Sequence, residues 1–144
     1  MIFSAQDEFS NKQAVTASAA STNYIDLLAA GTPYGAAAAL NRDLGKGGKI
    51  PLHIQVTTAF ATLTSLKVSV ETDDNSSFSS ATTVLETEAI AAASLIAGYV
   101  FNIDEIPLRT TERYVRLYYT VAGSNATAGN IQAGITMGNQ QAPI

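Results

Sequence analysis

The first candidate for chemistry is His53, the single histidine of a chain that contains no cysteine. Catalysis of the serine-hydrolase type needs a His, a carboxylate and a nucleophile brought together. Serines are spread along the whole sequence, and no serine is distinguished as a nucleophile by its neighbours. His53 also takes an outward position in a run with strand-like alternation, so we expect an exposed or rim polar side chain there.

Three further segments contain groups that bind ions or move protons. Residues 73–77 offer oxygen ligands for Ca²⁺, but they lack the EF-hand spacing and its bidentate Glu, so we expect a hairpin turn. Asp104 and Glu105 are neighbours, and neighbours in an extended segment point to opposite faces, so we expect no acid–base pair. Gly45–Lys49 lacks the Ser or Thr of a phosphate loop and leads into a strand, so we expect a glycine turn.

The composition excludes several classes of protein. The absence of cysteine rules out disulfides, thiol nucleophiles, zinc fingers and iron–sulfur centres, and one His rules out a His-rich metal cluster. The net charge is −4 and the Lys and Arg are scattered, so we expect no direct nucleic-acid contact. No apolar run reaches the roughly 20 residues of a membrane span, and Met1–Glu8 does not resemble a secretory signal. We therefore expect no cofactor and no membrane partner.

The elements that position these residues are short strands. Apolar residues alternate with polar ones over 50–57, 66–71, 114–121 and 131–137, and this period of two is typical of half-buried strands. Further short strands are expected in 14–28, 82–87 and 98–103. The pattern predicts an all-β, antiparallel jelly roll or β-sandwich of about seven to eight strands, with extended terminal arms.

One domain accounts for most of the chain. We predict an N-terminal arm over 1–13, a single β-sandwich over 14–137 with a loop insertion over 29–49, and a C-terminal tail over 138–144. The insertion is rich in Gly and Pro, although Ala36–Leu40 favours one helical turn because Ala is the best helix former.

Apolar side chains on polar termini suggest contacts with another chain. Phe3 and Phe9 lie in the predicted arm, and the chain ends in Pro143 and Ile144. These groups either fold back on their own core or pack on a neighbour. The outer face of the strand at 114–121 adds Tyr and Arg, which are frequent interface residues.

Six segments, taken in order, resemble a known family. They are Phe9–Thr16, Ser21–Leu27, Arg42–Gly45, Thr72–Ser80, Leu95–Tyr99 and Glu112–Tyr119. In this order the chain resembles the capsid cement (decoration) proteins of tailed bacteriophages, the family typified by the Bordetella phage cement protein. The resemblance extends from about Ala5 to Ile135, and residues 29–40 depart from it as an apparent insertion before Arg42.

This resemblance implies a function without catalysis. It implies a jelly roll that self-associates as a dimer or trimer, on the outer surface of the virion, after assembly in the host cytoplasm. Its partner would be an HK97-fold major capsid protein, whose neighbouring capsomers it would bridge so that the shell resists the pressure of packaged DNA. The candidate interface residues are Ile2, Phe3, Phe9, Tyr34, Arg42, Asp43, Tyr114, Arg116, Pro143 and Ile144.

Two other functions are open at this point. A carbohydrate- or receptor-binding jelly roll of a phage tail or fibre would need an exposed aromatic platform, and with no Trp only outward Tyr could form it. A cupin-like enzyme would usually need several His ligands, and the chain has one. An exposed Tyr platform would favour the first function, and apolar arms that reach away from the domain would favour cement.

Overall fold

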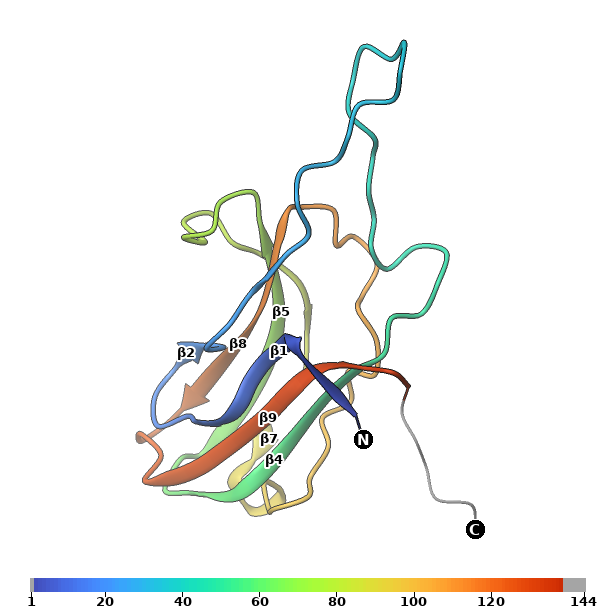
Figure 1. Cartoon of the computed structure of the whole chain (residues 1–144). Coiled ribbons are helices and arrows are strands. Elements are labelled where there is room, and N and C mark those ends of the chain that lie inside the picture. The colour runs from blue at the N-terminus through green and yellow to red at the C-terminus, as the bar shows by residue number, and fades with distance from the viewer. Residues whose placement is uncertain (1, 139–144) are drawn as a thin grey trace.

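The computed structural model describes residues 2–138 and shows two antiparallel β-sheets packed face to face (Figure 1). The first sheet has the order β1 (Phe3–Ala14), β9 (Ala128–Thr136), β4 (Leu52–Ala61). The second has the order β2 (Ala19–Ala20), β8 (Tyr114–Ala122), β5 (Ser65–Asp73), β6 (Thr82–Glu86). In addition, β3 (Ile25–Asp26) pairs with β8 and β7 (Ile90–Ala91) with β5, and a 3₁₀ turn, η1, follows at Ala92–Ser94.

This arrangement confirms the predicted all-β, antiparallel sandwich. The described residues form nine strands, and three of them, β2, β3 and β7, have only two residues. The four strands with the clearest alternation are the predicted ones. No helix within 2–138 has the length and hydropathy needed to cross a bilayer.

A single apolar core lies between the two sheets. Alternate side chains of β4 are fully buried, and the same is true of β5 and β8: these residues are Leu52, Ile54, Val56, Leu66, Val68, Val70, Leu117 and Tyr119. Burying one large aliphatic side chain contributes about 1.5–3 kcal/mol before the entropy of ordering is subtracted. The Tyr119 hydroxyl is buried as well and shares a 2.7 Å hydrogen bond with Ser10 Oγ.

The prediction of an N-terminal arm is wrong. Residues 3–14 form β1, which pairs with β9 along its length with several register shifts. Phe9 is fully buried in the core, so it is not a free interface residue. Phe3 instead lies over the outer face of the first sheet, with its ring 5.9 Å from the ring of His53. The arm therefore folds back on its own domain.

The predicted strand at 98–103 is also not a regular strand. This segment runs beside the edge of β4 and bonds to it irregularly: Gly98 N donates to Val56 O, Val56 N to Tyr99 O, and Phe101 N to Ile54 O. Gly98 has a φ of +94°, which breaks the extended conformation where the segment begins. The result is a cover for the β4 edge rather than another strand of the ladder.

Candidate functional site

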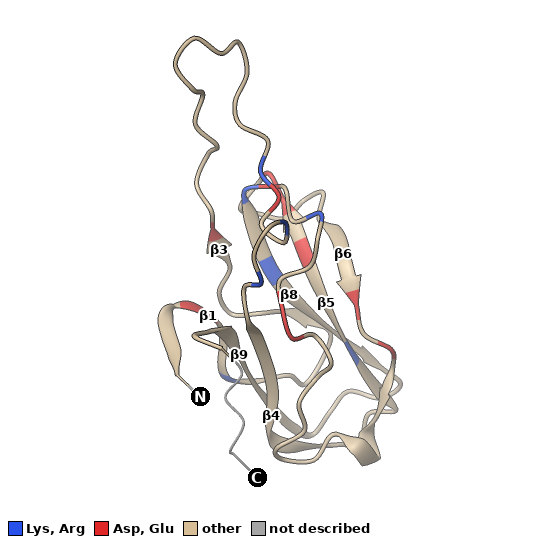
Figure 2. Cartoon of the chain, turned by 90° about the vertical axis from the view of Figure 1, so that its right-hand side faces the viewer, with Lys and Arg blue, Asp and Glu red and all other residues tan. Residues whose placement is uncertain are grey.

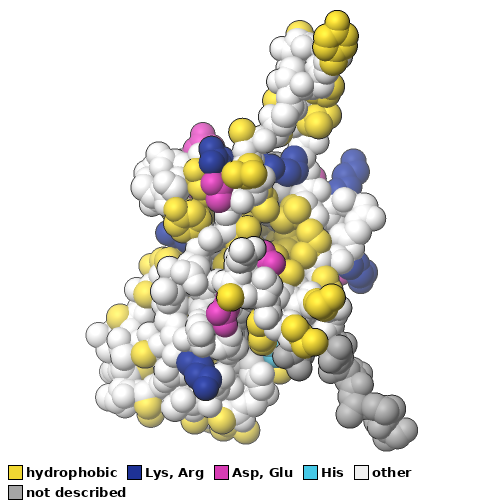
Figure 3. Space-filling view, in the orientation of Figure 1, with side chains coloured by type: hydrophobic (Ala, Val, Ile, Leu, Met, Phe, Trp, Pro, Cys, Tyr) yellow, Lys and Arg dark blue, Asp and Glu magenta, His cyan; other side chains and the backbone are white. Residues whose placement is uncertain are grey.

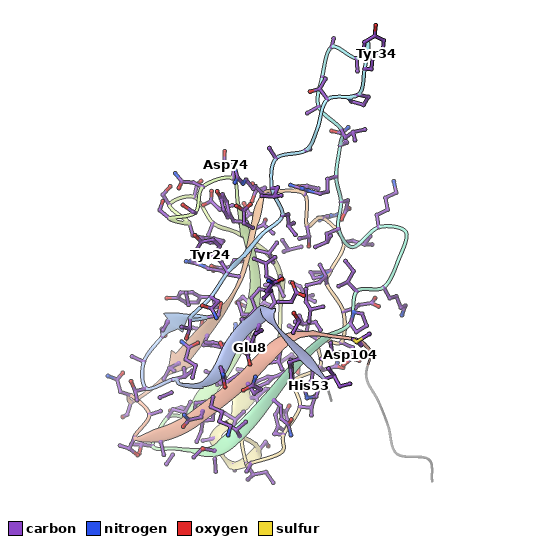
Figure 4. The ribbon with its side chains drawn as sticks, in the orientation of Figure 1. Glu8, Tyr24, Tyr34, His53, Asp74 and Asp104 are labelled. Atoms are coloured by element: carbon purple, nitrogen blue, oxygen red, sulfur yellow. The ribbon has the colours of Figure 1, made fainter. Side chains whose placement is uncertain are left out.

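A projecting loop, residues 28–41, rises from one end of the sandwich (Figure 1). Every residue from 31 to 41 is exposed, and no charged residue occurs between Asp26 and Arg42. Tyr34 stands at its tip with its side chain fully exposed (Figure 4). Leu28 and Leu40, near its base, are also mostly exposed.

The helical turn expected at Ala36–Leu40 is absent. Ala36 N donates to Pro33 O, which closes a tight turn, and Gly35 has a φ of +79°. The chain reverses at this turn, and Leu40 N then donates to Gly31 O across the two legs. Because the two sides of the loop bond to each other, no helical turn precedes the alanines, and a helix does not nucleate there.

Arg42 joins the two legs at the base of the loop. Its Nη1 donates to Leu27 O and its Nη2 to Leu28 O, both at 2.8 Å. Leu28 N in turn donates to the Asp26 carboxylate at 2.8 Å. A planar guanidinium that bonds two successive carbonyls fixes the direction in which the loop leaves the domain.

Asp43 and Gly45 anchor the same base to the 107–110 turn. The Asp43 carboxylate accepts a hydrogen bond from Arg109 N, 3.0 Å from each oxygen. A Cβ on Gly45 would lie 2.2 Å from Pro107 O, so only glycine allows this approach. We call the contacts of Arg42, Asp43 and Gly45 the base clamp. For the predicted interface residues, both Nη atoms of Arg42 and the carboxylate of Asp43 thus bond within the domain, whereas the buried Nε of Arg42 has no partner among the described residues.

An ion pair lies beside the base clamp. Arg113 donates from Nε and Nη2 to the two oxygens of Asp26, at 2.7 and 2.8 Å. This hydrogen bonding lowers the pKa of the Asp26 carboxyl from 3.8 to about 2 and raises the pKa of the Arg113 guanidinium. Asp26 therefore stays ionised and holds both Arg113 and the Leu28 amide.

An aromatic cluster of Tyr24, Phe78 and Tyr114 occupies the same end of the sandwich. Its three rings meet edge to face, with centroids 5.5–6.4 Å apart. The Arg116 guanidinium lies 4.2 Å from the Phe78 ring centre and pairs with Glu71 at 2.7 Å. Tyr114 and Arg116, the two predicted interface residues on β8, are thus half-buried and pack within this cluster.

The loop over 74–80 is held by Asp73. Burial raises the pKa of the Asp73 carboxyl, but hydrogen bonds from Asn75 N and Ser80 N outweigh it, so that the pKa lies below its ordinary value. The predicted turn is confirmed. Within residues 2–138, no three His, Cys, Asp or Glu side chains gather as a metal site would require.

The remaining predicted residues lie elsewhere. The expectation of an exposed His53 is wrong: its side chain is only 6% exposed because Phe3 covers it, and its Nε2 lies 3.2 Å from Gln55 Oε1. Glu105 pairs with Lys49 at 3.1 Å and Ile2 is exposed. Pro143 and Ile144 lie outside the described residues.

The structure therefore gathers Tyr34, Arg42, Asp43, Tyr114 and Arg116 at one end and excludes Phe3 and Phe9 from it. Figure 2 shows most Lys and Arg toward this end, and Figure 3 shows apolar side chains following the projecting loop while basic ones surround its base. Sequence reasoning missed Leu28 and Leu40. The long interval without charge from 27 to 41 was a signal that could have identified them.

A family model matches residues 9–135, which include the projecting loop, the base clamp and the aromatic cluster; it is that of Bbp16. The chain belongs to the Bbp16 family. This membership supports the predicted relationship to phage proteins and association with a virion. No curated protein matches the chain.

Proposed function

We propose that this Bbp16-family protein is a capsid cement protein. It binds the outer surface of a phage shell, bridges neighbouring capsomers of an HK97-fold major capsid protein, associates with its own copies and stabilises the shell. Family membership supports the phage setting, and the six ordered segments support the cement role. The proposal assigns the protein no catalytic reaction and no cofactor.

The observation that carries the proposal is the projecting loop. A Tyr side chain that passes from full exposure into an interface buries about 150–250 Å². At about 25 cal/mol per Å², that burial favours contact by about 4–6 kcal/mol before entropic costs. A domain that folds around its own core gains nothing from presenting Tyr34, Leu28 and Leu40 to water. The loop is therefore suited to contact another molecule on the particle.

The base clamp makes that contact mechanically useful. Arg42 holds both legs, and Asp43 and Gly45 fix the base against the 107–110 turn. A load on the loop therefore passes into the sandwich rather than into a flexible hinge. In this mechanism, two capsomers separate only after a bound copy has been stripped from one of them.

Binding of many copies to one shell makes the total attachment strong. A contact of modest affinity becomes strong when many copies are held on one lattice, because each later binding event gains effective concentration. The protein needs neither a deep pocket nor a tight single interface for this purpose.

The aromatic cluster gives little support to a carbohydrate-binding function. Its rings meet edge to face, Phe78 is only 8% exposed and Tyr24 is 48% exposed, so the cluster presents one half-exposed ring rather than a platform of several rings. Tyr34 stands apart from it at the loop tip (Figure 4). The expected apolar arm folds back as β1, and it is the projecting loop that reaches away from the domain.

The test is sedimentation with expanded phage capsids that lack the protein. We expect saturable binding at a fixed ratio to the major capsid protein, together with greater resistance of the shell to heat or osmotic shock. Capsids already saturated with the protein are the matched control and should bind no more. Absence of binding to every maturation state of the cognate capsid contradicts the proposal.

A further inference from the structure

A second apolar feature lies on the flank of the sandwich. A groove of about 330 Å³ opens between β6 and residues 99–102, and we call it the flank groove. Leu85, Ile90, Tyr99 and Phe101 supply its apolar lining, and Glu88 lies on its rim. Its volume is at the lower end of the range for sites that bind small ligands.

The groove lies between β6, an edge strand of the second sheet, and the segment that covers the β4 edge of the first sheet. Leu85 of β6 is the register partner of Val70, which is fully buried, yet Leu85 remains 40% exposed. On the opposite side, the β4 edge is covered by the irregular 98–103 segment instead of a strand. The core is thus incomplete at this flank, and one further apolar side chain would extend it.

The projecting loop of the same molecule does not fill this groove. The loop leaves the end of the sandwich and points away from its body, whereas β6 lies along the flank (Figures 1 and 2). The molecule therefore presents an apolar projection and an apolar groove that only two different copies can bring together.

We infer that the projecting loop of one copy inserts Tyr34 into the flank groove of a second copy. Tyr99 and Phe101 already meet edge to face, with centroids 5.2 Å apart, and a third aromatic ring can join them in the same way. The Tyr34 hydroxyl would then lie at the polar rim of the groove, in reach of solvent.

Charge favours the same encounter. Glu88 at the groove rim is exposed and makes no ion pair within residues 2–138. Lys46 and Arg109, near the base of the loop, are also exposed and make no ion pair in this part of the chain. Opposite charges near the two surfaces steer association, while the uncharged loop itself can enter an apolar site.

Because the two surfaces differ, each contact joins the loop of one copy to the groove of another. Two copies can exchange loops as a closed pair, or each copy can donate its loop to one neighbour and accept the loop of another, which gives rings or continuous rows. The inference rests on the proposed function in one respect: the shell holds copies side by side, so that a weak link between them suffices.

The test uses the absence of cysteine from the chain. One preparation contains Ala36→Cys beside the loop tip, and the other contains Asn102→Cys on the groove rim, so that Tyr34 and the apolar lining stay intact. The two are mixed under oxidising conditions, first free in solution at high concentration and then bound to capsids. The matched control replaces Asn102→Cys with Thr82→Cys, an exposed position on β6 outside the groove.

We expect the Ala36→Cys and Asn102→Cys pair to form disulfide-linked dimers on the order of tenfold faster than the control pair, because docking raises the local thiol concentration. Adding Tyr34→Ser to the first preparation, or Leu85→Glu to the second, should reduce that rate to the control level. Equal rates for both pairs, or no effect of Tyr34→Ser, overturn the inference. If the variants bind capsids without this cross-link, the inference fails and the cement proposal stands. If the variants cross-link in solution but bind no capsid, the inference stands and the cement proposal fails.

Discussion

Shortening the projecting loop should separate its role on the particle from its role in folding. Replacing residues 32–39 with Gly-Gly closes the loop at the point where Leu40 N already bonds to Gly31 O, so that the base clamp stays in place. The change removes Tyr34 and the turn around it. Nothing in the apolar core is lost, since every residue from 31 to 41 is exposed.

The expected change in the free energy of unfolding is much smaller than the expected loss of contact energy on the particle. The loop shrinks from about 14 residues to about 8, and the lower closure entropy stabilises the fold by about 0.5 kcal/mol. The contact made by Tyr34 loses up to about 4–6 kcal/mol of apolar burial at each copy. We therefore expect an unchanged or slightly raised free energy of unfolding together with a lost protective effect on capsids.

Two assays check this expectation on one preparation. Urea unfolding followed by circular dichroism measures the fold, and the temperature at which decorated capsids release DNA measures shell stabilisation. Gly31→Ala, at a position with open space around it, is the matched control and should leave both results unchanged. Destabilisation of the fold by about 2 kcal/mol or more would place the loop within the folded core. Full protection of capsids by the shortened variant would refute the role of the loop in contact.

Three further predictions concern the base of the loop and the nature of its contact. The pKa of Asp26 is about 2 in the folded chain against an ordinary value of 3.8, so its stabilising effect is complete above about pH 4 and is lost as the pH falls through about 2. Between pH 5 and pH 2, the melting temperature of Arg113→Ala should therefore fall less steeply than that of the unsubstituted protein. Gly45→Ala should destabilise the fold by about 1–3 kcal/mol in urea, because its Cβ would overlap Pro107 O, whereas a tolerated Gly45→Ala would contradict the base clamp. Capsid binding should weaken only slightly between about 0.05 and 0.5 M salt, since the loop has no charge to be screened, and a steep loss would indicate an ionic contact instead.

The central strands were predictable because each buries one face. In β4, β5 and β8 the buried apolar residues occupy alternate positions, although His53 and Ser69 between them are buried as well, and this apolar period is visible in the sequence. β1 was missed because its register against β9 shifts repeatedly and Lys12 has a φ of 47°, so that its buried residues are adjacent rather than alternating. A bulged strand has no period to detect.

The candidate site was predictable only in part. The Gly- and Pro-rich composition identified a loop near Tyr34, but not that the loop stands clear of the domain. The base clamp depends on residues distant in the chain, such as Asp43 with the Arg109 amide and Asp26 with Arg113. Pairing of this kind follows from the tertiary fold, and a single sequence contains no local signal for it.

The most direct measurement of the central claim is a cryo-EM difference map between capsids assembled with and without the protein. The cement proposal requires added density on the outer surface, at junctions between capsomers, with the projecting loop reaching a neighbouring molecule. Density confined to the inside of the shell or to the tail, or no difference at saturating protein, would contradict it.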